Sequence, residues 1–172
     1  MQIPTLETPR LILREPRLED FPSYAAMWAN PDVVRFISGK PQTEEEAWAR
    51  FLRVTGQWHL LGFGFWTIER KDTGRRIGEA GFVEGRRAIE PSLIGIPEIG
   101  WGIEPAEHGK GYAHEAAKAA LDWGIAHFGG RPIRCIIAPE NAPSIRLAQK
   151  LGFRELLRTT YHGEPTIMFE RR

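Results

Sequence analysis

The sequence predicts an α+β fold in which helices pack around one mixed sheet, and three observations lead to this prediction. The 172 residues suit a single domain, residues 1–172, with a substantial core. Segments with alternating apolar residues indicate strands, and segments with an apolar residue every three or four positions indicate helices. Their order is strand, two helices, three strands, helix, strand, helix and two strands.

The first half of the chain predicts a strand, two helices and a hairpin. The strand covers residues 10–14, where two leucines alternate with other residues. Acidic residues in the first turn begin a helix over residues 18–28. The capping box Thr43-Glu44-Glu45-Glu46 begins a second helix, which we expect to end by Gly56. The polar turn at residues 71–75 separates the two strands of an antiparallel hairpin.

A further strand is predicted over residues 98–104, and a glycine-containing loop follows it. Apolar residues alternate along this strand with small or acidic ones, so one face is buried and the other, with Gly100 and Gly102, is almost bare. A bare strand lets a ligand come close enough to hydrogen-bond with the backbone. We therefore expect its open flank to be a docking edge.

The loop Gly109-Lys110-Gly111 leads into the N-terminus of a helix, which is a favourable place for a phosphate group. The first N–H groups of a helix have no internal partner, and the helix dipole adds about half a positive charge there. A Walker loop is excluded, because Glu104 and Gly111 stand where that motif needs glycine and Ser/Thr. His114 excludes the dinucleotide fingerprint, which needs glycine or alanine at its position.

The last part of the chain predicts a strand, a helix and a final hairpin. The strand covers the apolar residues 133–138, and the helix covers residues 143–151 and ends at Gly152. Two strands, over residues 153–159 and 166–170, then complete the sheet.

Three segments resemble a known family. The run from His108 to Ala113 is similar to motif A of the GNAT N-acetyltransferase superfamily, Gln/Arg-x-x-Gly-x-Gly/Ala, with histidine in the first position. The stretch from Asn141 to Glu155 looks like motif B of that family. The opening Thr8-Pro9-Arg10-Leu11-Ile12-Leu13-Arg14 is similar to the first strand of the Rim-type branch, named for ribosomal-protein N-terminal acetyltransferases.

This resemblance implies a GNAT-type fold and its cofactor. The family has a mostly antiparallel sheet of about seven strands, splayed at the cofactor site and flanked by four main helices. It uses acetyl-CoA as donor and a primary amine as acceptor, with direct transfer between them. In the family, the pantetheine arm of acetyl-CoA pairs with the strand that corresponds to residues 98–104 here. The pyrophosphate of acetyl-CoA binds the loop that corresponds to Gly109-Lys110-Gly111. Carried over, the cofactor-binding residues are Gly100, Trp101, Gly102, Ile103, His108, Gly109, Lys110, Gly111, Tyr112, Ala113, Asn141 and Ser144.

Glu98 is the candidate catalytic base. An amine attacks only when neutral, and a lysine side chain has a reference pKa of about 10.4, so a base matters most for that kind of acceptor. Glu98 begins the docking strand, close to where the acceptor nitrogen must arrive. Alternatively, its carboxylate lies at the rim of the sheet and only attracts a cationic acceptor.

Ser144 is the candidate acid for the leaving thiolate. Many family members carry a tyrosine in the helix after Asn141, but this chain has none there. The Rim-type branch suggests Ser144 instead, and the alternative is an ordinary first-turn serine that bonds the backbone. Asn141 could be the N-cap of the helix, an anchor for the CoA arm, or both.

The acceptor pocket is expected between the first two helices and the hairpin. Cys135 lies in an apolar strand and is expected to be an inert buried thiol. The five histidines show no metal-ligand spacing, so no metal site is predicted. Aromatic residues that form either walls of the pocket or core are Trp28, Phe36, Trp58, Trp66 and Phe82.

The composition argues against several classes of partner. Lys plus Arg number 23 against 22 for Asp plus Glu, so the net charge of +1 gives no overall field that would attract nucleic acid or an acidic membrane. No apolar stretch approaches the ~20 residues of a membrane span. A single cysteine forms no intramolecular disulfide, so a cytoplasmic location is the simplest expectation. The last strands leave room for a homodimer.

The leading hypothesis is an N-acetyltransferase that moves an acetyl group from acetyl-CoA to a primary amine, on a protein N-terminus or a small molecule. One alternative is a detoxifying enzyme for antibiotics or polyamines, which an acidic acceptor cleft would favour. The other is a catalytically inactive CoA-binding sensor or adaptor, suggested by the missing tyrosine and by His108. Thioester turnover with a panel of amines distinguishes the three.

Overall fold

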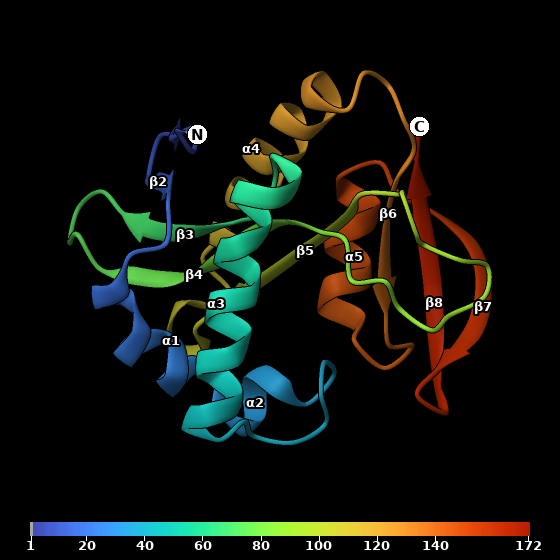
Figure 1. Cartoon of the computed structure of the whole chain (residues 1–172), viewed down its shortest axis with the longest axis horizontal. Helices are drawn as coiled ribbons and strands as arrows, with labels where there is room; N and C mark the ends of the chain where they lie inside the picture. Colours follow the sequence, from blue (N-terminus) through green and yellow to red (C-terminus); the bar gives the residue numbers. More distant parts are fainter. Residues whose placement is uncertain (1) are drawn as a thin grey trace.

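The computed structural model describes residues 2–172 and contains one open sheet with helices on both faces (Figure 1). The spatial order of its eight strands is β1-β2-β3-β4-β5-β6-β8-β7. Neighbouring strands are antiparallel except for the parallel pair β5 and β6. The predicted α+β class is confirmed. The sheet has one strand more than expected, because Leu6–Glu7 form a short edge strand.

The elements follow the predicted order. The strands are β1 Leu6–Glu7, β2 Leu11–Arg14, β3 Phe65–Arg70, β4 Arg76–Val83, β5 Glu98–Ile103, β6 Ile133–Ile137, β7 Arg154–Tyr161 and β8 Glu164–Arg171. The main helices are α1 Phe21–Trp28, α3 Glu44–Leu61, α4 Tyr112–His127 and α5 Ala142–Lys150, with a single turn α2 at Pro31–Val34 and two short 3-10 turns, Leu18–Asp20 and Pro105–Glu107.

Helix α3 is longer than expected. Its capping box is present, since Glu46 N–H donates to Thr43 Oγ1 and Thr43 N–H donates to the Glu46 carboxylate. The prediction that it ends by Gly56 is wrong. The apolar stripe continues to the buried Trp58, and the chain turns out of the helix only at Gly62, where φ is +79°.

The main core lies between the sheet and α4. Trp58, Trp66 and Phe82 are each at most 1% exposed in this core, so they do not line an acceptor pocket. Gly124 lets α4 approach the sheet closely, because a Cβ there would lie 2.2 Å from Cζ of Phe82. On the opposite face, α1 and α3 enclose a second cluster that includes Trp28.

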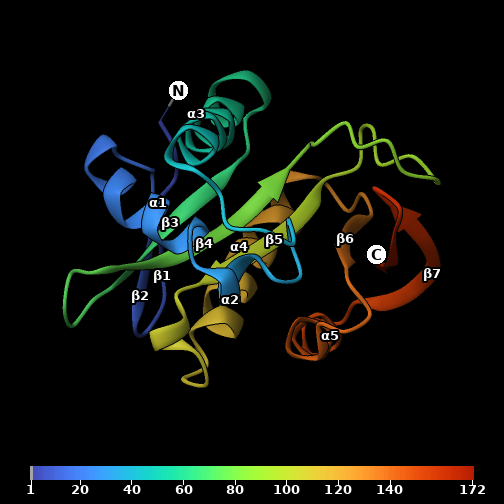
Figure 2. The same ribbon diagram turned by 90° about the horizontal axis from the view of Figure 1, so that it is seen from below.

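Strands β5 and β6 diverge from a single point. They pair only where Glu98 lies opposite Arg134, so the edge of β5 from Ile99 to Ile103 has no strand partner on this side. Seen from below, β5 and β6 run apart, with α4 and α5 beside the opening (Figure 2). This opening, which we call the gap, separates two parts of the sheet and contains the candidate site.

Candidate functional site

The open backbone edge of β5 forms one side of the gap. Its two glycines are not bare, as expected from the sequence, because side chains from other elements cover them. A Cβ on Gly100 would lie 2.9 Å from Cζ of Phe65, and one on Gly102 would lie 3.7 Å from Cε of Met27. Gly100 therefore lets Phe65 of β3 pack closely against β5, whereas Met27 of α1 covers Gly102 at an ordinary contact distance. The feature open to a ligand is the edge rather than the face.

The loop before α4 presents free backbone N–H groups. Gly109 and Gly111 have φ of +74° and +82°, in the left-handed region that favours glycine. Across residues 2–172, the N–H groups of residues 109–114 have no hydrogen-bond acceptor, whereas that of Glu115 bonds to the Gly111 carbonyl. A row of free N–H groups at a helix N-terminus is a site for phosphate oxygens.

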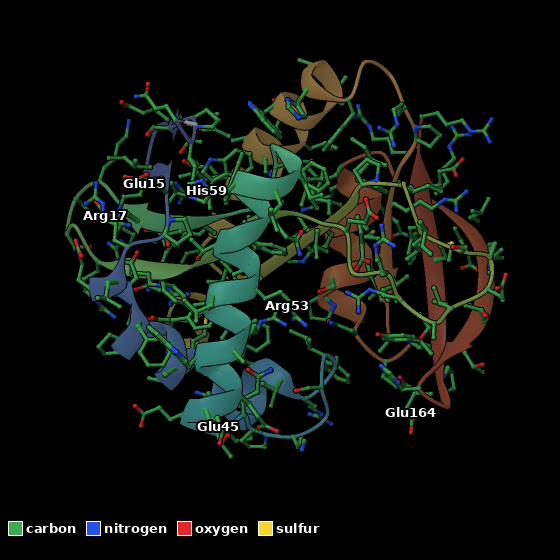
Figure 3. All side chains as sticks on the ribbon, viewed as in Figure 1. Glu15, Arg17, Glu45, Arg53, His59 and Glu164 are labelled. Carbon is green, nitrogen blue, oxygen red and sulfur yellow. The ribbon has the colours of Figure 1, made fainter. Side chains whose placement is uncertain are left out.

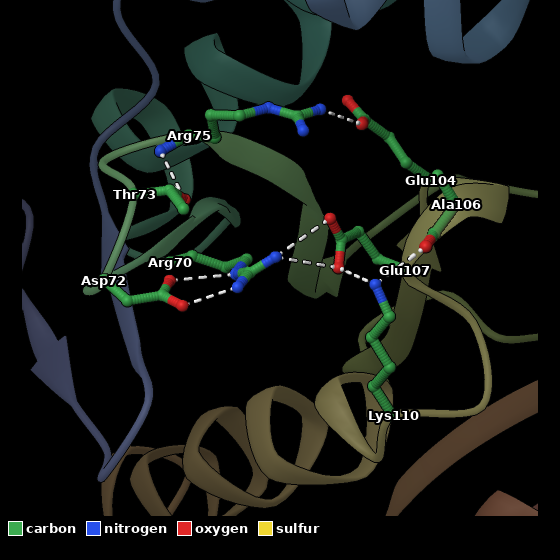
Figure 4. A network of polar contacts seen from close by, with 8 residues as sticks. All are labelled: Arg70, Asp72, Thr73, Arg75, Glu104, Ala106, Glu107 and Lys110. Carbon is green, nitrogen blue, oxygen red and sulfur yellow. Dashed lines mark hydrogen bonds and ion pairs between the residues drawn. The ribbon is translucent and has the colours of Figure 1, made fainter.

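The buried carboxylate of Glu107 binds Lys110 and thereby fixes the position of the loop (Figure 4). Glu107 is 4% exposed and accepts hydrogen bonds from Lys110 Nζ at 2.9 Å and from Arg70 Nη1 at 3.2 Å. The hydrogen bond from Lys110, helped by Arg70, lowers the pKa of Glu107 below its ordinary value. The Lys110 ammonium also donates to the Ala106 carbonyl, so this side chain braces the loop.

His108 does not extend toward the loop N–H groups. Its ring atom Nε2 lies 2.8 Å from the Ile103 carbonyl oxygen, and its backbone N–H donates to the Pro105 carbonyl. The histidine thus closes the end of β5, and a contact with pyrophosphate through its side chain stays a prediction.

Glu98 lies at the point where β5 and β6 meet and is 6% exposed. Arg87, in the segment after β4, donates to both of its carboxylate oxygens, and Arg87 Nη1 also lies 3.2 Å from the Tyr161 hydroxyl. Burial alone would lower the pKa of Arg87, but its hydrogen bonds and charge attraction with Glu98 raise it. An arriving amine must therefore share an oxygen that Arg87 already uses.

Ser144 lies across the gap from β5. The indole Nε1 of Trp101 is 3.4 Å from Ser144 Oγ, so a side chain of β5 reaches α5. Asn141 caps α5, since its Oδ1 accepts the N–H of Ser144 at 3.3 Å. The Ser144 hydroxyl donates to no group in the part of the chain that the structure describes, so its proton remains free for a ligand.

Cys135 is placed as the sequence indicated for an inert thiol. It is 2% exposed on β6, and burial, followed by the nearby charge of Glu98, raises its pKa. Thiolate is the nucleophilic form, so this cysteine is a poor nucleophile.

Comparison with known proteins now assigns the family. The family model for the acetyltransferase (GNAT) domain matches residues 10–154. The chain belongs to the GNAT acetyltransferase family. Its relatives include the N-acetyltransferase p20 of Bacillus licheniformis, 31% identical over 88% of this chain and 83% of that protein. They also include YoaA, an N-acetyltransferase of Bacillus subtilis, 30% identical over 88% of this chain and 84% of that protein.

Solved structures share the GNAT fold over the whole chain. A GnaT-family acetyltransferase from Bordetella pertussis superimposes with a TM-score of 0.88 at 32% identity, over 99% of this chain and 100% of that one. RimL, a ribosomal L7/L12 α-N-protein acetyltransferase solved with coenzyme A, has a TM-score of 0.78 over 98% of this chain and 97% of its own. At 15% identity, RimL shares the fold alone.

The chain is therefore an N-acetyltransferase, and enzymes of its family use acetyl-CoA. The residues present fit this cofactor, because free N–H groups for a diphosphate lie at the end of an unpaired strand edge. None of the helices between residues 2 and 172 has the length and apolar character needed to span a membrane. A cytoplasmic location and a homodimer stay predictions.

Several residues around the site were not found from the sequence. Arg87 holds Glu98, while Arg50 of α3 and Arg76 of β4 pair with Glu79 and Glu104. The sequence contained one signal of this polar region, because Arg76 and Glu79 are charged residues in an otherwise apolar strand. The structure shows that both are buried. Buried charges in a strand indicate a polar site, since such groups are costly without partners.

Proposed function

We propose that this enzyme transfers the acetyl group of acetyl-CoA directly to a primary amine, with no acetylated enzyme intermediate. The observation that carries this proposal is one arrangement: the free N–H groups of residues 109–114 lie at one end of the unpaired edge of β5, and Ser144 lies across the gap. When bound, acetyl-CoA supplies the activated acetyl group. Holding two reactants side by side can supply about 7–11 kcal/mol of the barrier, so no covalent step is needed.

The chain's own groups then have distinct roles in this proposal. The loop N–H groups and those of the β5 edge bind and orient the donor, and a backbone N–H on that edge stabilises negative charge on the carbonyl oxygen. The Ser144 hydroxyl donates a hydrogen bond to the departing sulfur and passes on a proton that it regains from water, while Trp101 keeps that hydroxyl in place. Glu98 accepts a proton from the amine through an oxygen that it shares with Arg87. Cys135 takes no part.

The acceptor is a primary amine on a protein N-terminus or a small molecule. A CoA-binding adaptor without catalysis would keep the same loop and strand edge, so the test has to measure turnover. We expect free thiol to be released from acetyl-CoA in the presence of at least one class of amine, with the amine gaining one acetyl group by mass spectrometry. Binding of acetyl-CoA without thiol release for any peptide N-terminus, amino acid or polyamine would support the adaptor instead.

A further inference from the structure

The face of the sheet under α1 and α3 contains buried hydrogen-bond donors without acceptors. Six buried side-chain polar atoms have no partner within residues 2–172, and five of them belong to four residues. The sixth is an amide oxygen of Gln42. Four of the five are N–H groups that can only donate. The five atoms are the Tyr24 hydroxyl, Trp28 Nε1, Arg50 Nε, and Nε and Nη2 of Arg76, and we call these four residues the donor cluster.

Aromatic and cationic side chains hold the donor cluster together. The Arg50 guanidinium lies 3.7 Å from the centre of the Trp28 ring, and that of Arg76 lies 5.2 Å from the centre of the Tyr24 ring. The two rings are themselves 6.2 Å apart. Tyr24, Trp28 and Arg76 are 2%, 2% and 7% exposed, so water does not reach them freely.

Each arginine of the donor cluster has one acidic side chain within ion-pair distance. Glu79 lies 3.5 Å from Arg50, and Glu104 lies 3.8 Å from Arg76 while also pairing with Arg75 at 3.4 Å. Burial, which is only partly offset by Glu79 and Glu104, lowers the pKa of Arg76. These two carboxylates balance the two guanidinium charges, but they leave Arg50 Nε and Arg76 Nε and Nη2 without hydrogen-bond acceptors.

One more arginine, Arg53, extends the positive charge toward the rest of the sheet. Figure 3 shows Arg53 projecting from α3 toward the C-terminal half of the molecule. Arg50 and Arg87 each have an acidic partner, whereas Arg53 makes no ion pair within residues 2–172, so its charge would attract an anion to this side of the sheet.

The donor cluster lies next to β5, the strand whose edge would bind acetyl-CoA. Arg76 Nη1 is 3.9 Å from the sulfur of Met27, and Met27 covers Gly102 of β5. Glu79 and Gly102 are register partners on β4 and β5. A small acceptor whose amine lies at the β5 edge would thus have its far end close to the cluster.

We propose that the donor cluster binds a carboxylate of the acceptor, so that the acceptor is a small amine that also carries a carboxylate, such as an amino acid. This inference rests on the proposed amine transfer. A carboxylate only accepts hydrogen bonds, and guanidinium groups bind it with paired, charge-assisted bonds. Buried guanidinium N–H groups are costly without an acceptor, and a carboxylate removes that cost. The same positive charge repels polyamines and cationic antibiotics.

The test compares matched acceptors. Each free amino acid in a panel is measured beside its carboxamide, which keeps the amine and side chain but loses the negative charge, and beside spermidine. We expect kcat/KM to be about 10- to 100-fold higher for the amino acids. The carboxamide amine is less basic and more often neutral, so chemistry alone would favour it. Faster transfer to carboxamides or to spermidine would overturn the carboxylate site and leave amine transfer intact.

Variants then locate the effect. Arg50→Gln is expected to remove most of the preference for the acid over its carboxamide, measured as the ratio of the two kcat/KM values for the same variant. Arg158→Gln is the matched control, because Arg158 is exposed on β7 and pairs only with Glu155. A fall in melting temperature in Arg50→Gln with an unchanged preference would show a structural role and overturn the proposal. If no amine is acetylated, the same panel is titrated into the CoA-loaded protein by calorimetry. Binding of the free amino acids but not of their carboxamides supports the carboxylate site, and binding of neither overturns it.

Discussion

Arg87 holds both carboxylate oxygens of Glu98, with N–O distances of 2.7 Å and 2.8 Å. Both side chains are largely buried where β5 and β6 separate. The pair therefore joins the segment after β4 to the origin of the gap, and the candidate base is also a structural residue.

The two roles of Glu98 can be separated by mutation. Glu98→Leu leaves Arg87 buried without its partner and is expected to reduce the free energy of unfolding by about 3–5 kcal/mol. The double variant Arg87→Met/Glu98→Leu replaces both partners with apolar side chains and is expected to recover most of that loss. Urea unfolding measures stability, and thiol release measures turnover. If Glu98 is the base, turnover stays low in the double variant. Recovery of turnover together with stability would show that the pair only supports the fold.

The loop N–H groups are tested with two glycines that share one conformation. Gly109 and Gly163 have φ of +74° and +81°, and a Cβ would meet no atom within 4 Å at either position. Alanine at each position costs a similar amount, about 1–2 kcal/mol, because the left-handed region disfavours a Cβ. We expect Gly109→Ala alone to raise the Kd for acetyl-CoA, by about 10-fold, in calorimetry. Acetyl-pantetheine lacks the diphosphate, so its binding should not change. Equal weakening of both ligands would contradict a phosphate role for the loop.

The sequence predicted the order of the elements and the free N–H groups because both depend on local patterns. The strand-loop-helix of residues 98–127 needs only alternation, two glycines and a helical period. Partners distant in the chain could not be predicted in the same way. Arg87 lies 11 residues before Glu98, and Ser144 lies 43 residues after Trp101, and no local pattern links either pair. The extent of α3 was missed for a different reason, since Gly56 is tolerated inside a helix that packing stabilises.

The proposed proton donor is tested at Ser144. Ser144→Ala is expected to lower kcat by about 100-fold while the KM for acetyl-CoA changes little, because general acid catalysis typically contributes 10²- to 10⁴-fold. Ser144→Thr keeps a hydroxyl and should retain more activity. Trp101→Phe keeps a ring and loses the indole N–H, so it should lower kcat in the same direction but less. An increase in KM with kcat unchanged in Ser144→Ala would assign the serine to binding of the donor.

Direct transfer predicts that Cys135 is dispensable. Cys135→Ala is expected to keep turnover and to lose about 1 kcal/mol of unfolding free energy, since the small change leaves only a small cavity in the core. Iodoacetamide should label the native protein slowly and the unfolded protein quickly, because burial raises the pKa of this thiol. Mass spectrometry after acetyl-CoA is added should find no acetylated protein. A stable acetyl adduct that disappears in Cys135→Ala would establish a covalent intermediate.

Asp20 should make the fold sensitive to acid. It is 4% exposed and accepts hydrogen bonds from both Nη atoms of Arg14 at 2.8 Å and from the N–H of Arg17 at 2.8 Å. Burial alone would raise its pKa, but these bonds outweigh burial and lower it below the ordinary value of 3.8. A lowered pKa in the folded state means that the unfolded chain binds the proton more readily. The stability from Asp20 is therefore complete above about pH 4 and is lost as pH falls through the folded pKa.

The variant Asp20→Asn isolates this contribution from that of other carboxylates. At pH 7 its free energy of unfolding is expected to be about 3–5 kcal/mol lower than that of the wild type, because Arg14 loses a buried partner. As pH falls below about 4, the unfolded wild-type chain binds a proton at Asp20 before the folded protein does, so the wild type loses stability and the difference between the two proteins should shrink. Urea unfolding from pH 7 to pH 3 measures it, and Asp32→Asn, at an exposed position, is the control that should follow the wild type. A difference that stays constant over this range would mean that packing around Asp20, rather than its charge, stabilises the join between β2 and α1.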